Sequence, residues 1–248
     1  MVFEMPVLLS QITFTLITLA TTYLIRYTNQ DPNPPKSEPA EKSPANYYAT
    51  DTTKKDTLMA AGFYLTPAKH INAITLVGIA HALLALPPEA QRVALCPNYN
   101  NAPRSGTVFA WNLYTTFTLA LLWASLLLRL AAYSNLGSSF TYFITKPSSG
   151  LKTTGVHRSI RHPSYTGLFG ITLGMVLLFF RARGLIGCWL PAPVAYLLEG
   201  LFWVWGVFLV PGVFWVRVRE EEAFLAEEFG EEWAAYVART WRFAPGLI

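Results

Sequence analysis

Five apolar stretches set the strongest constraint on what this chain can fold into. They cover roughly residues 5–25, 71–87, 107–129, 165–181 and part of 184–216. A helix needs about 20 apolar residues to cross a hydrocarbon core of about 30 Å, and fewer at the margins. We therefore expect an all-α, polytopic integral membrane protein with about five transmembrane helices.

The composition agrees with a membrane protein. Hydrophobic residues make up 52% of the 248 residues and charged residues only 14%, whereas soluble domains carry about 25% charged residues. The net charge of +4 is too small and too scattered to indicate nucleic-acid binding. Lysines and arginines instead cluster near the ends of the apolar stretches, where lipid headgroups attract them. Membrane lipid is thus an expected partner, and nucleic acid is not.

The N-terminal stretch is predicted to be a retained span rather than a signal peptide. Met1 to Thr22 contains no lysine or arginine, and no small-residue cleavage site follows it. Residues 26–70 are rich in proline, serine and charge, which predicts a flexible loop. We expect two regions: 1–130 with the N-terminal helices and this loop, and 131–248 with the remaining spans and the tail.

Charge placement predicts the orientation in the membrane. With the N-terminus outside the cytosol and one crossing per stretch, fifteen of the nineteen lysines and arginines face the cytosol. Only Arg92, Arg104, Arg181 and Arg183 lie on the opposite side. This positive-inside bias requires an odd number of crossings within 184–216. That stretch is interrupted by prolines, so it could be one broken helix or a short piece followed by a span.

The two cysteines, Cys96 and Cys188, show no metal-ligand or disulfide pattern. Apolar or proline-rich sequence flanks both, and the chain has neither a CxxC motif nor a Cys/His cluster. The sequence therefore predicts packing roles for both cysteines, no disulfide and no metal site.

A first polar cluster precedes the fourth apolar stretch, in the sequence "RHPSY". Pro163 suits the first turn of a helix, where its missing N–H costs nothing. Arg161 and His162 would then lie at the membrane boundary, beside free N–H groups that attract anions. Arginine and tyrosine also commonly anchor spans at the interface, so this cluster alone does not define a site.

A second polar cluster is the tail, which reads as an amphipathic helix. Its apolar ladder is Leu225, Phe229, Trp233 and Val237, flanked by Tyr236. Gly230 interrupts this ladder and suggests close packing. Just before it, Glu220, Glu221 and Glu222 follow two arginines at the end of the last span. These carboxylates could be a solvated helix face, or they could bind a cation such as a sulfonium or an ammonium.

Together the two clusters resemble the isoprenylcysteine carboxyl methyltransferase family of integral membrane enzymes. The matching parts are "LKTTGVHRSIRHPSYTG", residues 151–167, and "RVREEEAFLAEEFGEEWAAYVART", residues 217–240. The resemblance covers about the last 100 residues. Two features depart from the family pattern. His157 stands where an aromatic residue is common, and the connection from Gly167 to Glu221 is longer than in compact members.

The resemblance implies an S-adenosylmethionine-dependent methylation of the C-terminal carboxylate of prenylated cysteine in CaaX proteins. Residues 131–248 would be the catalytic region, with a cofactor pocket at the cytosolic face of the endoplasmic reticulum membrane. The implied cofactor-binding residues are Leu151, Gly155, His157, Arg161, His162, Pro163 and Tyr165. The implied catalytic residues are Arg217, as partner of the substrate carboxylate, and the pair Glu221 and Glu222.

The residues are compatible with this chemistry without the resemblance. No GxGxxG motif follows a strand, so a cofactor pocket must be built from loops and helix ends at the membrane surface. Three other functions stay open at this point. They are methylation of a phospholipid amine or another small lipophile, an NADPH-dependent sterol-reductase-like activity, and a non-enzymatic scaffold.

Overall fold

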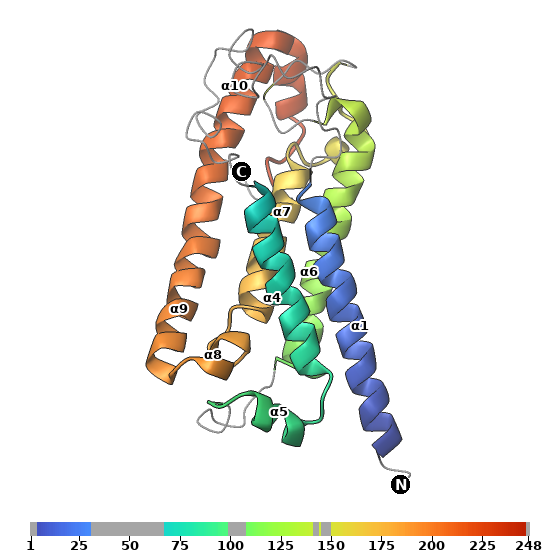
Figure 1. Cartoon of the computed structure of the whole chain (residues 1–248). Coiled ribbons are helices and arrows are strands. Elements are labelled where there is room, and N and C mark those ends of the chain that lie inside the picture. Colours follow the sequence, from blue (N-terminus) through green and yellow to red (C-terminus); the bar gives the residue numbers. More distant parts are fainter. Residues whose placement is uncertain (1–3, 31–66, 99–107, 141–143, 145–149, 247–248) are drawn as a thin grey trace, which may run out of the picture. The chain divides into compact units, whose positions relative to one another are not determined.

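The computed structural model describes residues 4–30, 67–98, 108–140, 144 and 150–246 (Figure 1). Its helices are α1 Glu4–Thr28, α4 Pro67–Ala85, α5 Glu89–Leu95, α6 Leu113–Leu136, η2 Gly137–Ser139, η3 Gly155–Arg158, α7 Pro163–Leu178, α8 Leu185–Trp189, α9 Ala192–Val204, η4 Trp205–Leu209 and α10 Val210–Val237. Within the described ranges, β-structure is limited to an isolated parallel bridge between Ile160 and Trp241. The predicted all-α class is confirmed.

Helices occupy all five places where the sequence predicts spans. Three are long and apolar enough to cross a membrane: Val7–Thr28, Leu113–Ser139 and Ala192–Val237. The apolar helices His70–Ala85 and Pro163–Leu178 are shorter. The chain is therefore an integral membrane protein, and the number of five crossings stays a prediction because it depends on the two shorter helices.

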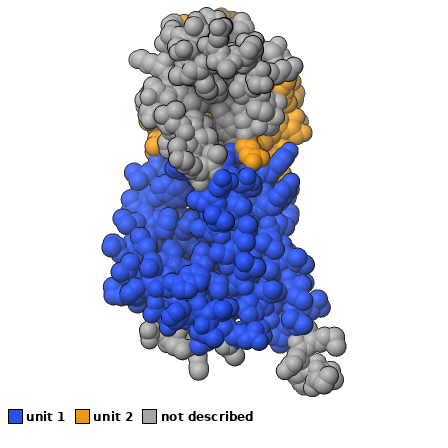
Figure 2. Space-filling model, in the orientation of Figure 1, with its two compact units in different colours: residues 1–29, 68–127, 167–211 blue, residues 30–67, 128–166, 212–248 orange. Residues whose placement is uncertain are grey.

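The chain divides into two compact units, which Figure 2 colours separately. Unit 1 comprises residues 1–29, 68–127 and 167–211, and unit 2 comprises 30–67, 128–166 and 212–248. Helices α6, α7 and α10 contribute residues to both units. The functional division into 1–130 and 131–248 is a different kind of boundary and stays a prediction.

Small residues bring the helices of unit 1 close together. A Cβ atom added to Gly78 of α4 would overlap the Thr22 side chain of α1. Added to Gly170 of α7, it would overlap the Ser125 hydroxyl of α6. In lipid the hydrophobic effect does not drive helices together. Close packing at small residues provides the attraction between them instead.

Threonines in α1 are buried without leaving unsatisfied hydroxyl groups. Thr18 Oγ1 donates to the Phe14 carbonyl at 2.9 Å, and Thr22 Oγ1 donates to the Thr18 carbonyl at 2.9 Å. Trp123 Nε1 of α6 donates to Thr21 Oγ1 at 2.9 Å. Bonding within the helix removes the desolvation cost of a hydroxyl group in an apolar medium.

The ambiguous stretch 184–216 folds as a short helix followed by one long span. Helix α8 is only five residues long, and the chain then stays helical from Ala192 to Val237. The π-helical turn η4 ends two residues before Pro211. A proline removes one N–H and crowds the carbonyl four residues earlier. A π-turn is a known way for a helix to continue past such a local disruption.

The prediction for the two cysteines is wrong, because Cys96 and Cys188 form a disulfide across 92 residues of sequence. Cys96 directly follows α5 and Cys188 lies in α8, and the backbone N–H of Asn98 also donates to the Cys188 carbonyl at 3.3 Å. Only the packing of these two short helices within unit 1 brings the sulfur atoms together. A pair so distant leaves no local spacing pattern to recognise.

The expected close packing at Gly230 is also wrong. A Cβ atom added there would meet no atom within 4 Å. Instead Gly230 has φ 49° and ψ −118°, a non-helical conformation that kinks α10. Residues with a Cβ rarely adopt such angles, and glycine adopts them readily. The predicted amphipathic helix is therefore two helical segments joined by this kink.

The disulfide predicts a simple labelling pattern, because the chain contains only two cysteines. In membranes denatured without reductant, polyethylene glycol maleimide should add no mass to the protein. After reduction, it should add two polymer chains. A double Cys96→Ser/Cys188→Ser variant provides the unlabelled control, and labelling of unreduced wild type would contradict the disulfide.

The kink predicts that Gly230→Ala destabilises the protein by about 1–3 kcal/mol, through backbone strain alone. The matched control is Gly212→Ala, in the same helix and also with no atom within 4 Å of the added Cβ. There alanine should be neutral or stabilising by up to about 1 kcal/mol, because alanine is the better helix former. Thermal unfolding of the purified proteins in detergent compares them. Equal melting temperatures for the two variants would contradict the role given to Gly230.

Candidate functional site

The start of α7 places the first group of predicted site residues. Pro163 is the first residue of α7, as expected, and it is buried. Arg161 and His162 immediately precede it, and Tyr165 lies in the first helical turn. Proline at this position has a preset φ angle and no N–H to leave unsatisfied. The backbone that carries the neighbouring side chains, His162 and Tyr165, is therefore rigid.

The carboxylate of Glu222 lies at the centre of the site. Arg161 Nε donates to its Oε1 at 3.1 Å, and His162 Nε2 lies 3.2 Å from the same oxygen. Arg242 approaches both oxygens, with Nη2 at 2.7 Å from Oε2 and Nε at 3.0 Å from Oε1. The Glu222 side chain is only 14% exposed. Two guanidinium groups and an imidazole thus use most of its capacity to accept hydrogen bonds.

Glu221 has a different environment from its neighbour. Tyr165 donates its hydroxyl to Glu221 Oε2 at 3.1 Å, and His162 Nδ1 lies 4.0 Å from Oε1. Its side chain is 32% exposed, more than twice the exposure of Glu222. Within the described part of the chain, neither Arg161 nor Arg242 forms a hydrogen bond or ion pair with Glu221. Glu221 therefore retains a carboxylate surface that a cation could approach.

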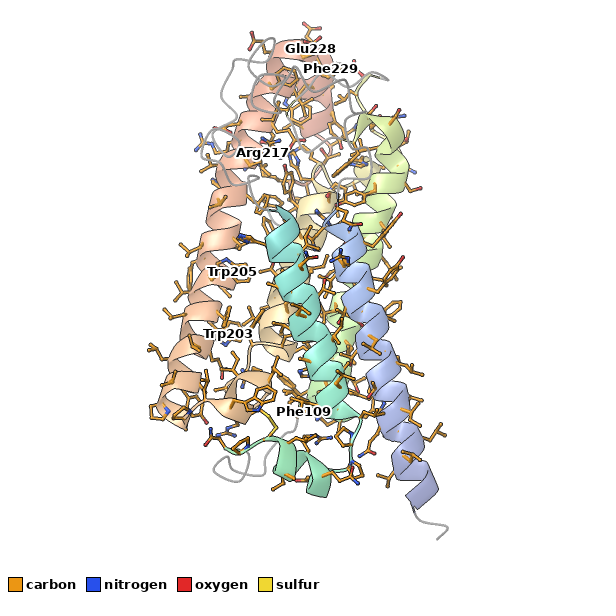
Figure 3. All side chains as sticks on the ribbon, viewed as in Figure 1. Phe109, Trp203, Trp205, Arg217, Glu228 and Phe229 are labelled. Atoms are coloured by element: carbon orange, nitrogen blue, oxygen red, sulfur yellow. A yellow bond between two sulfur atoms is a disulfide. The ribbon has the colours of Figure 1, made fainter. Side chains whose placement is uncertain are left out.

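Arg217 is buried, at 4% exposure, on the part of α10 that belongs to unit 2. It lies on the same helix as Glu228 and Phe229 (Figure 3). It precedes Glu221 by four residues, which is about one helical turn. The two residues are thus on neighbouring positions of one helix face, and the role of Arg217 toward a carboxylate stays a prediction.

The chain after α10 completes the site, a contribution that the sequence did not predict. The Trp241 N–H donates to the Ser159 carbonyl at 2.9 Å, and the Arg161 N–H donates to the Trp241 carbonyl at 2.8 Å. The His162 N–H donates to the Arg242 carbonyl at 3.0 Å. In sequence Arg242 was only one of many cytosolic charges. The one available signal was its place between two aromatic residues close to a Pro-Gly ending.

Arg161 is fixed at both its backbone and its side chain. Besides Glu222, its Nη1 donates to the carbonyls of Val237 and Thr240, at 3.1 and 2.8 Å. Val237 is the last residue of α10, and Thr240 follows it by three residues. Carbonyls at a helix end lack the N–H groups of a following helical turn. Arg161 therefore caps carbonyl groups at and after the end of α10, and it binds the Glu222 carboxylate at the same time.

His157 is buried and bonded on two sides. Its Nδ1 lies 2.7 Å from the Asn135 side-chain oxygen, and the Tyr236 hydroxyl donates to its carbonyl at 2.6 Å. Burial lowers the pKa of His157 from 6.5 to about 4, and the nearby His162 ring adds to this shift. These contacts join α6, η3 and α10 within unit 2, and binding of a cofactor by His157 stays a prediction.

A hollow lies beside η3, with a volume of about 690 Å³. Its lining residues are Thr153, Thr154, Gly155, Arg158, Ser159 and Arg239. Gly155 has φ 60°, and a Cβ there would overlap the Asn135 amide, so this position needs glycine. Gly155 thus lies at a cavity, whereas the half-buried Leu151 is not among its lining residues.

The chemistry of the site suits a small organic cation. The Glu221 carboxylate is partly exposed, and the Tyr165 ring that bonds it packs against Phe214, with ring centroids 5.5 Å apart. Carboxylates and aromatic faces both attract cations. The described residues contain no group of three or more His, Cys, Asp or Glu side chains arranged to hold a metal.

Comparison with known proteins gives two findings. The model of the isoprenylcysteine carboxyl methyltransferase family matches residues 118–227. The chain is also 28% identical over 193 residues to the protein-S-isoprenylcysteine O-methyltransferase of Schizosaccharomyces pombe, which covers 77% of this chain and 73% of that protein. The family match includes Glu221 and Glu222 and ends before Arg242.

The buried His157 predicts a loss of stability in acid. The unfolded chain takes up a proton near pH 6.5, whereas the folded chain resists it until about pH 4. The free energy of unfolding should fall as the pH drops through this window, by up to about 1.4 kcal/mol per pH unit. In His157→Gln, which does not titrate, the melting temperature should fall less between pH 6.5 and 4.5.

The matched control for this prediction is His70→Gln, a substitution at an exposed histidine of α4. It should follow the wild-type pH dependence. An equal fall in melting temperature for His157→Gln and wild type would show that His157 does not cause the acid sensitivity.

Proposed function

Because the model of the isoprenylcysteine carboxyl methyltransferase family matches residues 118–227, we propose that the chain methylates the C-terminal carboxylate of prenylated cysteine in processed CaaX proteins. The product is a methyl ester. The observation that best supports this is the separation of the two glutamates. Glu222 is enclosed by Arg161, His162 and Arg242, and Glu221 stays open to a cationic ligand.

We propose S-adenosylmethionine as the methyl donor. When bound, it supplies an electrophilic methyl group on a sulfonium. The partly exposed Glu221 carboxylate and the Tyr165 ring provide the negative charge and the aromatic face that such a cation requires. Arg161, His162 and Pro163 would form the rigid wall of this pocket, with Gly155 and Leu151 earlier in the chain.

The reaction requires that the acceptor carboxylate be oriented toward the methyl group, and it requires no proton transfer. A carboxylate is already ionised near pH 7, so it can attack the methyl carbon without a general base. A new O–CH₃ bond forms as the S–CH₃ bond breaks, and the electron pair of that bond stays on the sulfur. The positive charge of the donor and the negative charge of the acceptor cancel during transfer. A site with little water favours this cancellation.

The proposed role of Arg217 is to hold the acceptor carboxylate in line with the methyl group. Its guanidinium is buried on α10, one helical turn before Glu221. Guanidinium and carboxylate groups pair through two parallel hydrogen bonds, which fix direction as well as distance. The buried position also limits competition from water, and correct alignment is worth several orders of magnitude in rate.

The proposed location is the endoplasmic reticulum membrane, with the site facing the cytosol. The positive-inside bias supports this orientation. The disulfide supports it independently, because Cys96 and Cys188 lie in connections that the charge bias assigns to the opposite, luminal side. Disulfides persist in the oxidising lumen and are rare in the cytosol. The prenyl chain would remain in the bilayer, which stabilises binding by about 0.8 kcal/mol per buried CH₂.

A labelled-methyl assay tests the proposed function. Membranes containing the protein receive methyl-labelled S-adenosylmethionine and N-acetyl-S-farnesylcysteine. We expect base-labile label in the acceptor, because an ester releases methanol in alkali. Base-stable label in lipid would move the acceptor to an amine, and no label with correctly inserted protein would overturn the proposal.

In the same assay, Arg217→Gln should lower kcat/KM for the acceptor about 10- to 100-fold, which corresponds to a lost charged hydrogen bond of 1.5–3 kcal/mol. The control is Arg219→Gln, an exposed arginine two residues further along α10. It should keep near wild-type activity. Equal losses in both variants would contradict a specific role for Arg217.

A further inference from the structure

The C-terminal segment Thr240–Phe243 runs alongside the residues that precede α7. Three backbone hydrogen bonds, from Trp241, Arg161 and His162, join the two stretches over 159–162. Thr166 of α7 also donates its hydroxyl to the Phe243 carbonyl. The backbone of the two proposed donor-binding residues, Arg161 and His162, is therefore anchored to the last described residues of the chain.

Arg242 is the part of this segment that enters the charge cluster. Among the described residues, it is the only one of the three side-chain partners of Glu222 that contacts both carboxylate oxygens. Its guanidinium also lies over the Trp215 ring of α10, at 5.0 Å from the centroid. The planar guanidinium of Arg242 contacts the Trp215 ring and the Glu222 carboxylate at the same time, so it has little freedom to reorient.

The three partners of Glu222 are divided unequally between its two oxygens. Both Arg161 and His162 contact the same oxygen, Oε1. Oε2 has contacts only with Arg242 among the hydrogen bonds of the described residues. Loss of Arg242 would leave one oxygen of a mostly buried carboxylate without a donor, and such a group rotates or draws in water.

We propose that Arg242 is a positioning residue for the methyl donor, an inference that rests on the proposed function. By fixing Glu222, it holds the Arg161 and His162 side chains and the adjacent Glu221 in the geometry that receives the sulfonium. Arg242 lies beyond the matched residues 118–227, so the end of the chain completes a site that the family match only partly contains.

The test measures donor and acceptor kinetics separately in the full-length protein. We expect Arg242→Gln to raise KM for S-adenosylmethionine at least tenfold, and to change KM for N-acetyl-S-farnesylcysteine less than twofold. Arg242→Lys keeps the positive charge but cannot form the paired hydrogen bonds of a guanidinium. It should raise the donor KM to a value between those of wild type and Arg242→Gln. Binding of S-adenosylhomocysteine to the purified protein, by calorimetry, should weaken in the same order.

A second substitution distinguishes positioning from a general loss of structure. In Glu222→Gln/Arg242→Gln the uncompensated carboxylate is gone, so donor KM should be no higher than in Arg242→Gln alone. The control Arg219→Gln changes an exposed arginine of α10 and should leave the donor KM unchanged. If Arg242→Gln does not fold, the donor KM of Arg242→Lys is used for the test, and its melting temperature is measured to show that it is folded.

The possible failures are distinguishable. A wild-type donor KM in folded Arg242→Gln or Arg242→Lys would overturn the role of Arg242. An equal rise in donor and acceptor KM would also overturn it, because that pattern indicates a global rather than a local effect. Wild-type protein that neither binds S-adenosylhomocysteine nor methylates the acceptor would instead overturn the proposed function itself.

Discussion

The ion-pair cluster around Glu222 is the interaction on which the rest of the site depends. One carboxylate joins the stretch before α7, the helix α10 and the segment after it, through Arg161, His162 and Arg242. A carboxylate with this little exposure is stable only when cations and hydrogen bonds replace its water. The stretch before α7 supplies two of those partners, α10 supplies the carboxylate and the segment after it supplies the third partner, so none of the three segments can move without disturbing the others.

The membrane limits where such a cluster can form. In unit 1, threonines of α1 bond within their own helix, and glycines allow neighbouring helices to pack closely. Charged side chains in hydrocarbon would be costly, so a charged site belongs at helix ends. All the charged residues proposed for the site lie in unit 2, at the start of α7, along the polar part of α10 and in the segment after α10.

The two adjacent glutamates illustrate how the fold assigns different tasks to equivalent residues. Successive residues of a helix point about 100° apart. Glu222 therefore faces the arginines while Glu221 faces Tyr165 and retains its exposure. The Gly230 kink adds to this, because it redirects the end of α10 and so allows Arg161 to bond the carbonyls of Val237 and Thr240.

The sequence by itself determined the helices and the residues of the two clusters. Apolar length predicts spans because hydrocarbon thickness is fixed, and Pro163 marks a helix start because its backbone geometry is local. Only the tertiary structure decided the contacts between distant parts of the chain. Cys96 with Cys188, and Arg242 with Glu222, depend on how helices pack, and neither pair has a local spacing that sequence can reveal. Gly230 is an intermediate case. The sequence showed a glycine within the predicted helix, but only the structure showed that its φ angle is positive.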